Sequence, residues 1–432
     1  RKGQRSIVVE QAPQLGEIGA GIQIGPNAFH CFDYLGVGDE ARSVAVYIDH
    51  LRLMDAQTAE DITSIPLDDP FRKFYGNPYA VVHRADLHGV LLKFCETSPL
   101  VDIRTNHVVT GYEQDGTSAT LLLKDREPLK GRFLIGAEGL RSPIRGQMIG
   151  DGEPRISGHA TYRSVIPTEQ MPEDLRWNAA TLWAGPKCHI VHYPLKGGKV
   201  YNLVVTYHRD EKEAIAGKPV SKEDVAQGFE HIHPRARQII EHGTDWKQWV
   251  LCDRDPISNW VDGRVALLGD SAHPMLQYFA QGACMAMEDA VALSHCIENH
   301  GQDIEGALQR YQQMRMVRTA RVQMNSRLIG EYIYHPDDAK AAVRNHVMRS
   351  MGADDWYRQL NWLYGSNGLD AAAIPGTGKD GRVTKGDVLS YLKNPPAAPV
   401  APAPAAPAAP EAAPGQAMTQ IPSRPAGPRE ER

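Results

Sequence analysis

The feature that most constrains this chain is a change of pattern around Gly269. The apolar run "RVALLG" ends at this residue, and a long stretch with helical character begins at Gly282. A short continuous apolar run bounded by turn residues is typical of a buried strand. The segment that joins the two elements is polar and contains Asp270 and Gln277. A strand that leads into a helix in this way predicts an α/β fold, and the polar residues between the two elements require an explanation.

The start of the chain contains a second strand of this kind. "RSIVVEQAP" is rich in β-branched residues and ends at an acidic residue, Glu10. In a dinucleotide-binding βαβ unit, an acidic residue at this position bonds a ribose hydroxyl, and a Gly-rich loop precedes it. Glu10 fits that position, but the Gly-rich loop is not in the sequence. A solvated carboxylate at a strand end is the simpler interpretation of Glu10 taken alone.

The middle of the chain predicts a sheet. From 156 to 249 strand-like runs dominate, and several alternate between polar and apolar residues, as antiparallel strands with one wet face do. "KEDVAQGFEHIHPRARQIIEH" interrupts them with a helical pattern, and the chain is helical again from Gly282 towards Trp362. The earlier strand "RFLIGAEG" includes Gly136 and Gly139, which allow a backbone to approach a ligand closely.

Charge and composition exclude several classes of partner. The formal net charge is -5, and because phosphate groups are bound by basic patches, nucleic acid is not an expected partner. No apolar run is long enough to span a membrane, and no signal peptide is recognisable. The six cysteines are scattered without a CxxC pair. This pattern argues against a disulfide framework or a zinc site, and the expected location is the cytoplasm.

The pattern changes again near Asn367. "IPGTGKDGRVTKGDVLSYL" predicts a small unit of loop and helix over 369–393, and the Ala/Pro-rich segment 394–432 is predicted to be disordered because it cannot bury a core. The first segment resembles the second half of the peripheral subunit-binding domain of dihydrolipoamide acyltransferases, and the second resembles their interdomain linker. We therefore expect a fusion of two unrelated partial proteins, joined near Gly368.

Residues 5–365 resemble the single-component flavoprotein aromatic hydroxylases of the para-hydroxybenzoate hydroxylase fold. Three segments carry the resemblance in the expected order and spacing. They are "VVEQ" with "GEIGAGIQIGPNA" after it, "RFLIGAEGLRSPIR", and "GDSAHPM" with "QGACMAMEDA" after it. Two further stretches, "TLWAGPKCHIVHYPL" and "HPMLQYFAQGA", are closest to the 3-hydroxybenzoate 6-hydroxylases.

The resemblance implies an α/β fold with an FAD-binding Rossmann-like domain, an antiparallel-sheet substrate domain and C-terminal helices. We expect the FAD-binding domain in two parts, 1–155 and 252–300, the substrate domain at 156–251 and the helical region at 301–368. The first strand and the Gly-rich loop, which cradle the pyrophosphate of FAD, are missing. We therefore expect a truncated sequence with weakened FAD binding. A second departure is Glu138, which stands where the family usually has Asp and would disturb a contact near the flavin.

The resemblance also implies the residues that hold FAD. Asp270 would accept a hydrogen bond from the ribityl chain. Gly282 and Ala283 would let a helix N-terminus meet the isoalloxazine ring, where backbone N–H groups favour the negative charge of reduced flavin. Glu10 would bond the ribose, and Arg84 would reach the pyrophosphate or the ribityl chain. Without the resemblance, Asp270 is interpreted as a turn or N-cap residue, and Arg84 as a surface residue at a helix end.

The substrate residues come from a predicted strand and from the polar segment before the helix. His189 and Tyr193 are spaced four apart in "CHIVHYP", which puts both on one face of a strand. The resemblance places them over the substrate ring, with Gln277 opposite. Gln277 stands where many relatives have Pro and can bond a polar substrate edge. Asp49 and Tyr79 resemble two further pocket positions. Without the resemblance, His189 and Tyr193 are sheet residues packed on their neighbours.

The predicted reaction is hydroxylation of 3-hydroxybenzoate to 2,5-dihydroxybenzoate, with FAD as cofactor and with NADH and O2 as co-substrates. The attacking carbon lies para to the phenol oxygen, so a base near that oxygen accelerates the reaction. A neutral His tuned near physiological pH suits this role. The alternatives are a salicylate or 6-hydroxynicotinate hydroxylase, or a non-catalytic truncated chimera with a weak interaction segment for an acyltransferase complex. Use of NADPH and formation of a homodimer are left open.

Overall fold

The computed structural model describes residues 3–16 and 20–365 of the chain. The chain divides into two units between Asn367 and Gly368, the position where the sequence predicts the junction of two partial proteins. The predictions for 369–393 and 394–432 fall outside the described residues. Among the described residues, none of the helices has the length and apolar character needed to cross a membrane.

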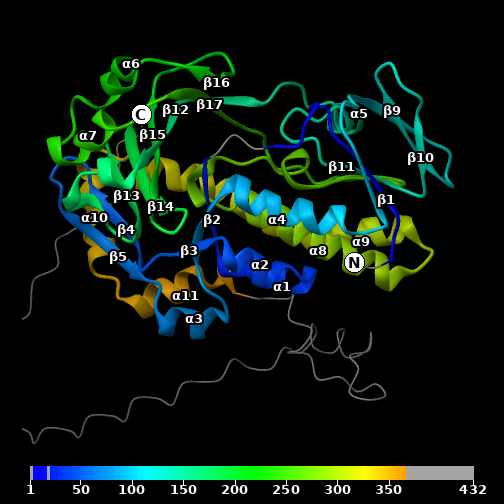
Figure 1. Ribbon diagram of the computed structural model, residues 1–432, viewed down its shortest axis with the longest axis horizontal. Helices are drawn as coiled ribbons and strands as arrows, with labels where there is room; N and C mark the ends of the chain where they lie inside the picture. The colour runs from blue at the N-terminus through cyan, green and yellow to red at the C-terminus, as the bar shows by residue number, and fades with distance from the viewer. Residues whose placement is uncertain (1–2, 17–19, 366–432) are drawn as a thin grey trace, which may run out of the picture. The chain divides into compact units, whose positions relative to one another are not determined.

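The largest element of the first unit is an eight-stranded sheet (Figure 1). All neighbouring strands in it are antiparallel except one pair, which confirms the predicted antiparallel sheet. In spatial order the strands are β16 (Ala216–Pro219), β17 (Lys247–Asp253), β12 (Arg155–Pro167), β15 (Val200–His208), β14 (Cys188–Leu195), β13 (Ala179–Gly185), β4 (His50–Asp55) and β5 (Asp61–Pro66).

The strands β4 and β5 come from a part of the chain that the sequence pattern groups with the FAD-binding residues. β4 runs parallel to β13, with Leu53 opposite Leu182 and Leu51 opposite Ala180. Leu53 and Ala180 are buried, so the pairing is supported by side-chain packing as well as by the backbone ladder. The sheet therefore extends beyond the segment 156–251. A domain boundary at residue 155 would divide it, with β4 and β5 on one side and its other strands on the other.

Several small sheets make up the rest of the unit. β1 pairs in parallel with β7, and β11 pairs in parallel with β19, as expected of a Rossmann-like domain. Among the described residues, β1 pairs with β7 alone, and its Ile7 and Val8 are exposed. The strands are β1 (Ser6–Val9), β2 (Gly21–Ile24), β3 (Ala45–Tyr47), β6 (Ala80–His83), β7 (Val101–Arg104), β8 (Val109–Gln114), β9 (Ala119–Leu123), β10 (Leu129–Gly131), β11 (Leu134–Gly136), β18 (Val261–Asp262) and β19 (Val265–Leu267).

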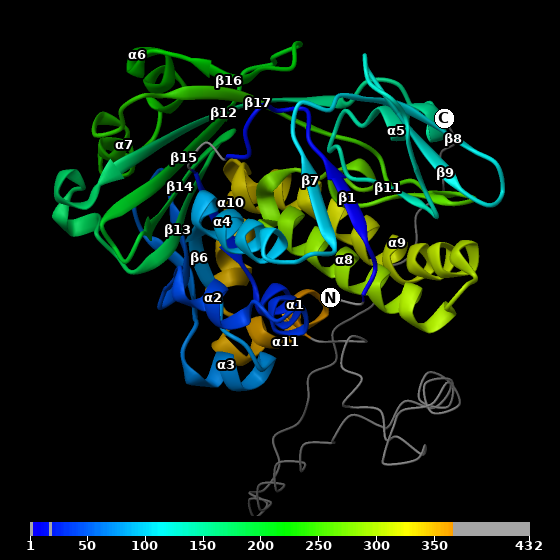
Figure 2. The same ribbon diagram turned by 45° about the vertical axis from the view of Figure 1, so that its right-hand side comes forward.

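Two long helices, α8 and α9, lie side by side next to these small sheets, as both ribbon views show (Figures 1 and 2). The chain after α9 forms a short π-helical segment, η6 (Gly330–Tyr334), and two more helices, which agrees with the predicted C-terminal helices. The helices are α1 (Pro26–Leu35), α2 (Gly38–Ser43), α3 (Asp69–Tyr75), α4 (Arg84–Glu96), α5 (Pro143–Ile149), α6 (Lys222–Ala226), α7 (Pro234–Glu241), α8 (Gly282–His300), α9 (Ile304–Ile329), α10 (Asp338–Arg349) and α11 (Ala353–Tyr364).

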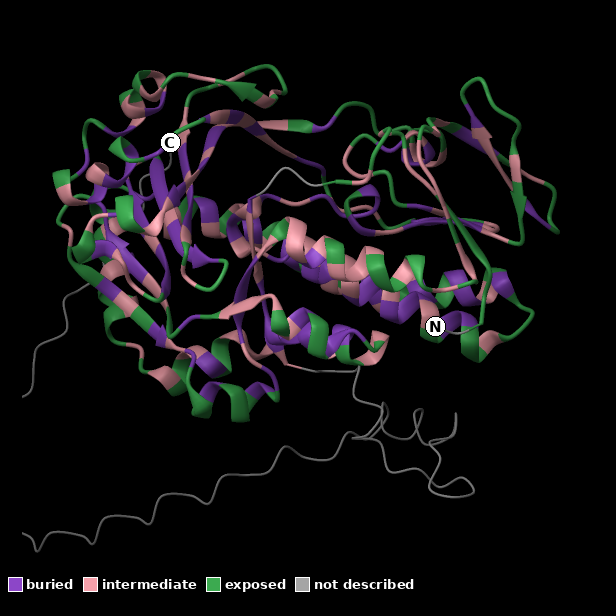
Figure 3. Cartoon of the chain, in the orientation of Figure 1, coloured by how far each residue is buried: buried purple, intermediate pink, exposed green. Residues whose placement is uncertain are grey.

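Both faces of the central strands of the large sheet are covered, so β13, β14 and β15 are buried along most of their length (Figure 3). On one face Trp183, Phe229 and Ile239 belong to a core that includes residues of α7. On the other face Tyr193 packs in a core with Tyr79 and residues of α11. This second face carries the cavity described next.

Candidate active site

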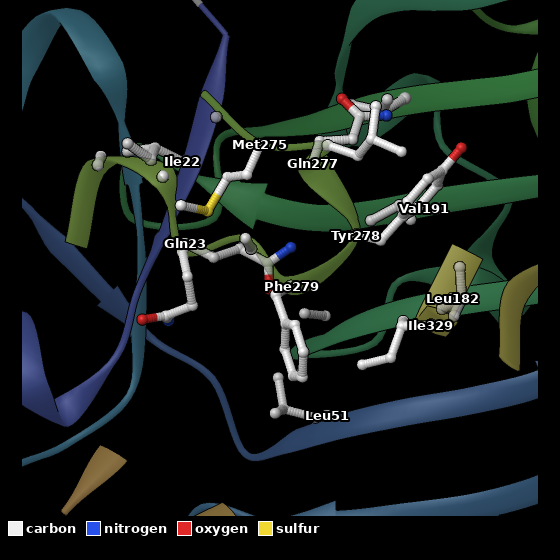
Figure 4. A pocket seen from close by; sticks show the side chains of 18 of the residues that line it. Ile22, Gln23, Leu51, Leu182, Val191, Met275, Gln277, Tyr278, Phe279 and Ile329 are labelled. Atoms are coloured by element: carbon white, nitrogen blue, oxygen red, sulfur yellow. The ribbon is translucent and has the colours of Figure 1, made fainter. Parts of the chain in front are cut away.

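A cavity of about 710 Å³ lies between the large sheet and the N-terminus of α8. That volume falls in the usual range for small-molecule and cofactor sites. Its wall is mostly apolar, and Figure 4 shows Phe279, from the short turn η5 (Gln277–Phe279), pointing toward Leu51 of β4. Residues of η6 also line it. The cavity is therefore lined by segments that are far apart in the sequence.

Strand periodicity decides which residues of β14 face this cavity. His189, Val191 and Tyr193 alternate along the strand and line the cavity, because side chains two apart share a face. His192 points to the other face, where its Nε2 accepts a hydrogen bond of 3.1 Å from Nε1 of Trp183. The predicted sharing of one face by His189 and Tyr193 agrees with this geometry.

The imidazole of His189 is buried and neutral. Its Nδ1 lies 2.7 Å from Nε2 of His335, so Nε2 is the ring nitrogen left for a ligand in the cavity. Burial, together with the nearby imidazoles of His159 and His208, lowers the pKa of His189 to about 3. The expectation of a pKa near physiological pH is therefore wrong. The reason is that His189 has almost no contact with water, which disfavours its charged form.

The ring of Tyr193 packs tightly against the backbone of β2. A Cβ atom built on Gly21 of β2 would clash with Cε2 of Tyr193, so the ring requires glycine at that position. The Gly21 N–H donates a hydrogen bond of 2.8 Å to Oδ1 of Asn202, which pairs with Tyr193 across β14 and β15. Burial raises the pKa of Tyr193, which keeps its hydroxyl protonated and able to donate.

Gln277 lies at the start of η5 and reaches the sheet. Its Oε1 accepts a hydrogen bond of 3.2 Å from Nη2 of Arg163, and its Nε2 lies 3.4 Å from the hydroxyls of both Thr161 and Thr206. A proline here could make none of these contacts. The amide therefore ties the segment before α8 to β12 and β15.

Arg163 is a site residue that the sequence analysis missed. It lines the cavity from β12, its guanidinium lies 5.3 Å from the ring centroid of Trp249, and its buried Nε has no hydrogen-bond partner. Burial lowers the pKa of Arg163, and no carboxylate forms an ion pair with it within the described residues. A buried cation without an anion is costly unless a ligand supplies one. The sequence feature that could have indicated this residue is an arginine inside the strand-like run "HATYRSVIP".

The opposite wall of the cavity carries four of the predicted cofactor residues: Arg84, Asp270, Gly282 and Ala283. α8 begins at Gly282, so its N-terminal N–H groups lie at the cavity. Asp270 is exposed to this space. Protein atoms packed around its carboxyl nevertheless reduce its hydration and raise its pKa. Because Gly282 and Ala283 have little or no side chain, a flat ring system can approach the helix end. This wall fits the isoalloxazine and ribityl parts of FAD.

Glu10 and Asp49 lie away from this cavity. Glu10 directly follows β1, and its Oε1 accepts a hydrogen bond of 2.8 Å from the N–H of Ala12. Asp49 is exposed between β3 and β4, and its N–H donates to the carbonyl of Asn178. Tyr79, the other predicted substrate residue, does line the cavity, and its hydroxyl donates to Oε1 of Gln23 over 2.6 Å.

Glu138, the departure noted in the strand "RFLIGAEG", contacts the loop that carries Asp270. Its Oε2 accepts a hydrogen bond of 2.6 Å from Ser142 and lies 3.4 Å from the hydroxyl of Ser271. Burial raises the pKa of its carboxyl, and these hydrogen bonds oppose that effect. The longer side chain is thus accommodated by serine partners.

A buried ion network lies beneath the N-terminal half of α8. Arg315 of α9 donates to Asp289 over 2.7 Å and to Glu288 over 2.6 Å. Asp289 also contacts Nε2 of His273 at 2.5 Å and accepts the Gly269 N–H over 3.0 Å. Burial alone would raise the pKa of Asp289, but His273 and Arg315 hold it well below its usual value. The network fixes the loop that carries Asp270 to α8 and α9.

This chain is similar to known FAD-binding proteins over most of its length. The family model described as "FAD binding domain" matches residues 1–326, and the model described as "e3 binding domain" matches residues 364–389. The 3-hydroxybenzoate 6-hydroxylase 1 of Aquipseudomonas alcaligenes is 52% identical over 370 residues, covering 86% of this chain and 94% of that protein. The 3-hydroxybenzoate 6-hydroxylase of Polaromonas naphthalenivorans is 46% identical over 367 residues, covering 85% and 91%.

Solved structures show the same fold at lower sequence identity. Klebsiella pneumoniae HpxO complexed with FAD and uric acid has a TM-score of 0.74 at 22% identity, covering 85% of this chain and 99% of that one. A salicylate hydroxylase substrate complex has a TM-score of 0.71 at 22% identity, covering 84% and 96%. Together with the extent of the family match, these findings show that the chain belongs to the FAD-binding-domain family that includes the 3-hydroxybenzoate 6-hydroxylases.

Proposed function

We propose that this chain is an FAD-dependent monooxygenase that uses NADH and O2 to hydroxylate 3-hydroxybenzoate to 2,5-dihydroxybenzoate. The observation that carries the proposal is the sheet wall of the cavity, where an apolar surface holds one unpaired guanidinium, Arg163, and one neutral imidazole, His189. An aromatic ring with a carboxylate and a phenol hydroxyl offers a complementary group to each. Curated 3-hydroxybenzoate 6-hydroxylases that are 43 to 52% identical to this chain support the same substrate.

Arg163 is proposed to bind the substrate carboxylate. Its Nη2 already contacts Gln277, and its Nε is free of partners. A carboxylate would satisfy that nitrogen and neutralise the buried charge at the same time. Hydrogen bonds between ionised groups are roughly twice as strong as neutral ones, so this contact would fix one end of the ring.

His189 is proposed to accept the phenol proton at Nε2. Removing that proton makes the ring electron-rich, which the attack by the carbon para to the oxygen requires. Because Nδ1 faces His335, the accepting nitrogen is defined by the hydrogen bond on the other side of the ring. Tyr193 and Gln277 are proposed to hold the ring between these two groups. Asp49 lies away from the cavity and takes no part in this arrangement.

FAD, when bound, supplies the redox chemistry by taking electrons from NADH and activating O2. On this chain, Arg84, Asp270, Gly282 and Ala283 are proposed to hold it, with the ring against the N-terminus of α8. Glu10 is proposed to bond its ribose. The FAD-binding part would then be discontinuous, built from residues of 1–155 and 252–300. The apolar wall would limit the access of water to the bound flavin ring.

The experiment that tests the proposal measures NADH oxidation by the FAD-loaded protein with 3-hydroxybenzoate, salicylate and 6-hydroxynicotinate. Products are identified by chromatography. We expect 2,5-dihydroxybenzoate from 3-hydroxybenzoate, with NADH consumed in equal amount. A product from salicylate or 6-hydroxynicotinate alone would assign the chain to the alternative hydroxylases. NADH oxidation without any hydroxylated product would contradict a hydroxylase function.

A second function is proposed for the tail, because the model described as "e3 binding domain" matches residues 364–389. We propose that this segment binds weakly to a dehydrogenase component of an acyltransferase complex. Calorimetric titration of the full chain with dihydrolipoamide dehydrogenase tests this, with the chain ended at Gly365 as the control. Equal heats from the two forms would contradict the proposal.

A further inference from the structure

Four histidines lie together at one end of the cavity, and the proposed reaction uses only one of them. Nδ1 of His189 lies 2.7 Å from Nε2 of His335, and Nδ1 of His335 lies 2.9 Å from Nε2 of His208. The ring of His159 stacks on that of His208, with 4.0 Å between the centroids. His189 and His335 are buried, whereas His208 and His159 are half-buried. The series therefore runs from the cavity towards the surface.

The backbone holds these rings in place. His159 and His208 are direct partners across β12 and β15. His335 follows η6, where its N–H donates to the carbonyl of Gly330 over 3.1 Å. Its own carbonyl accepts from the N–H of Lys187, just before β14, over 3.3 Å. The three strands and the π-helical segment thus meet at this cluster, which makes the ring-to-ring distances a property of the fold.

The number of lone pairs limits what the cluster can bind. A neutral imidazole has one N–H donor and one acceptor nitrogen. Because His335 contacts a histidine at each nitrogen, it must donate to one and accept from the other. Nitrogens of His159, His208 and His335 lie within 4.8 Å of one another, a spacing that a metal ion could use. In this arrangement, however, His335 has no lone pair left for a metal, so the hydrogen-bonded chain is favoured.

We propose that His189, His335 and His208 form a relay that carries the phenol proton of the substrate between the cavity and solvent. This inference rests on the proposed function. The phenol O–H bond breaks and its proton binds Nε2 of His189, which gives its Nδ1 proton to Nε2 of His335. His335 gives its Nδ1 proton to Nε2 of His208, and His208 releases its Nδ1 proton to water.

Each step of this relay breaks one bond to hydrogen and forms another, and no electrons are transferred. His189 and His335 each gain and lose one proton, so both end neutral in the opposite tautomer. The substrate becomes a phenolate, and the proton appears in water. When the hydroxylated ring regains its proton, the same chain working in reverse restores the starting tautomers.

The electrostatics of the cluster suit transit of a proton rather than its storage. Burial lowers the pKa of His189 to about 3 and that of His335 well below its ordinary value, so neither ring retains a proton at neutral pH. Burial also lowers the pKa of His208, with Lys187 acting in the same direction and Asp210 against it. Burial also lowers the pKa of His159, and the nearby cation Arg155 acts in the same direction. Nδ1 of His159 contacts the hydroxyl of Tyr278 at 2.5 Å.

The test follows the proton directly. FAD-loaded protein is mixed with 3-hydroxybenzoate in weakly buffered solution that contains a pH indicator, in a stopped-flow instrument. The wild-type protein should release a proton in a fast phase after binding. His335→Gln preserves a polar group that can donate and accept, but an amide does not pass protons on. It should slow proton release about 10²-fold, the lower end of the usual general acid–base effect, while the Kd of the substrate changes less than about threefold.

Two further measurements separate a relay from a structural role. In His208→Ala the gap lies near the surface, so added imidazole should restore the rate of proton release. His231→Gln, an exposed histidine whose Nε2 contacts the carbonyl of Pro186, is the matched control and should behave as wild type. Proton release by His335→Gln at the wild-type rate would overturn the relay, as would a stoichiometric metal ion in the purified protein. Absence of hydroxylated product from the wild-type protein would instead contradict the proposed function.

Discussion

The two walls of the cavity treat buried polar groups in opposite ways. Beneath α8, Arg315 is matched by Glu288 and Asp289, and each carboxylate has further partners. On the sheet wall, Arg163 has no carboxylate partner among the residues that the structure describes, and burial keeps the imidazole of His189 neutral. Charges that are paired within the protein hold a scaffold, whereas a charge left unpaired is available to a ligand. This difference supports the proposal that the substrate binds at the sheet wall, whereas α8 and α9 support the loop that carries Asp270.

The largest effect is expected from breaking the paired wall. Arg315→Leu leaves Glu288 and Asp289 buried without their main cation, and removal of one partner of a buried ion pair typically costs about 3–5 kcal/mol. Urea denaturation of the FAD-loaded protein should show this loss. Arg310→Leu, on the exposed side of the same helix, is the control and should change the free energy of unfolding by less than about 0.5 kcal/mol. Equal losses in the two variants would mean that the network is not a scaffold.

The next effect tests the neutral imidazole on the sheet wall. His189→Ala should slow hydroxylation by about 10²–10⁴-fold, the usual cost of losing a general base, and should leave flavin reduction by NADH less affected. Unused oxygen should then appear as hydrogen peroxide. Stopped-flow kinetics and a peroxide assay measure the two quantities. Hydroxylation of 3-hydroxybenzoate at the normal rate and with normal coupling would show that His189 is only a packed sheet residue.

A smaller effect is expected at the unpaired cation. Arg163→Met should raise the KM for 3-hydroxybenzoate by about 10- to 100-fold, which corresponds to the roughly 1.5–3 kcal/mol of a hydrogen bond to a charged group. Arg163→Lys keeps the charge and should recover part of this loss. The neutral 3-hydroxybenzamide provides the matched control, because its KM should change much less. A similar rise for acid and amide would indicate that Arg163 supports the wall without binding the carboxylate.

The smallest effect concerns the pH dependence of stability on the far face of the same sheet. Burial lowers the pKa of His192 from 6.5 to about 3, so the unfolded chain binds a proton there first as the pH falls. This contribution to stability is complete above pH 6.5 and is lost between 6.5 and about 3. His192→Gln should reduce the slope of unfolding free energy against pH by up to about 1.4 kcal/mol per unit in that window. An unchanged slope would contradict a neutral buried His192, and His231→Gln serves as the exposed control.

The sequence could predict what depends on local pattern. The alternation in "CHIVHYP" is enough to place His189 and Tyr193 on one face, and the strand before Gly269 is enough to place Asp270 near the start of a helix. What it could not predict depends on pairing between distant strands. The parallel alignment of β4 with β13 has no local indication, and the contact of Arg163 with Gln277 joins residues 114 positions apart.

The pKa of His189 also depends on contacts between distant parts of the chain, so the sequence could not predict it. A single strand shows a histidine but not the depth at which its ring lies. Its partner His335 directly follows a π-helical segment far along the chain, and the two residues are 146 positions apart. Burial and partners are set by the assembled fold, so the sequence suggested a base near physiological pH where the structure has a much weaker one.

The pairing of β4 with β13 has a consequence for exchanging parts between relatives. A crossover at residues 155 and 252 would transplant most of the large sheet but leave β4 and β5 from the recipient. The transplanted β13 would then meet a foreign strand along its whole length, with Leu182 against whatever residue occupies the position of Leu53. Substrate preference in such hybrids would change together with the packing between β13 and β4. Taking residues 50–66 from the same donor keeps this strand pair intact, and natural recombination between relatives is subject to the same requirement.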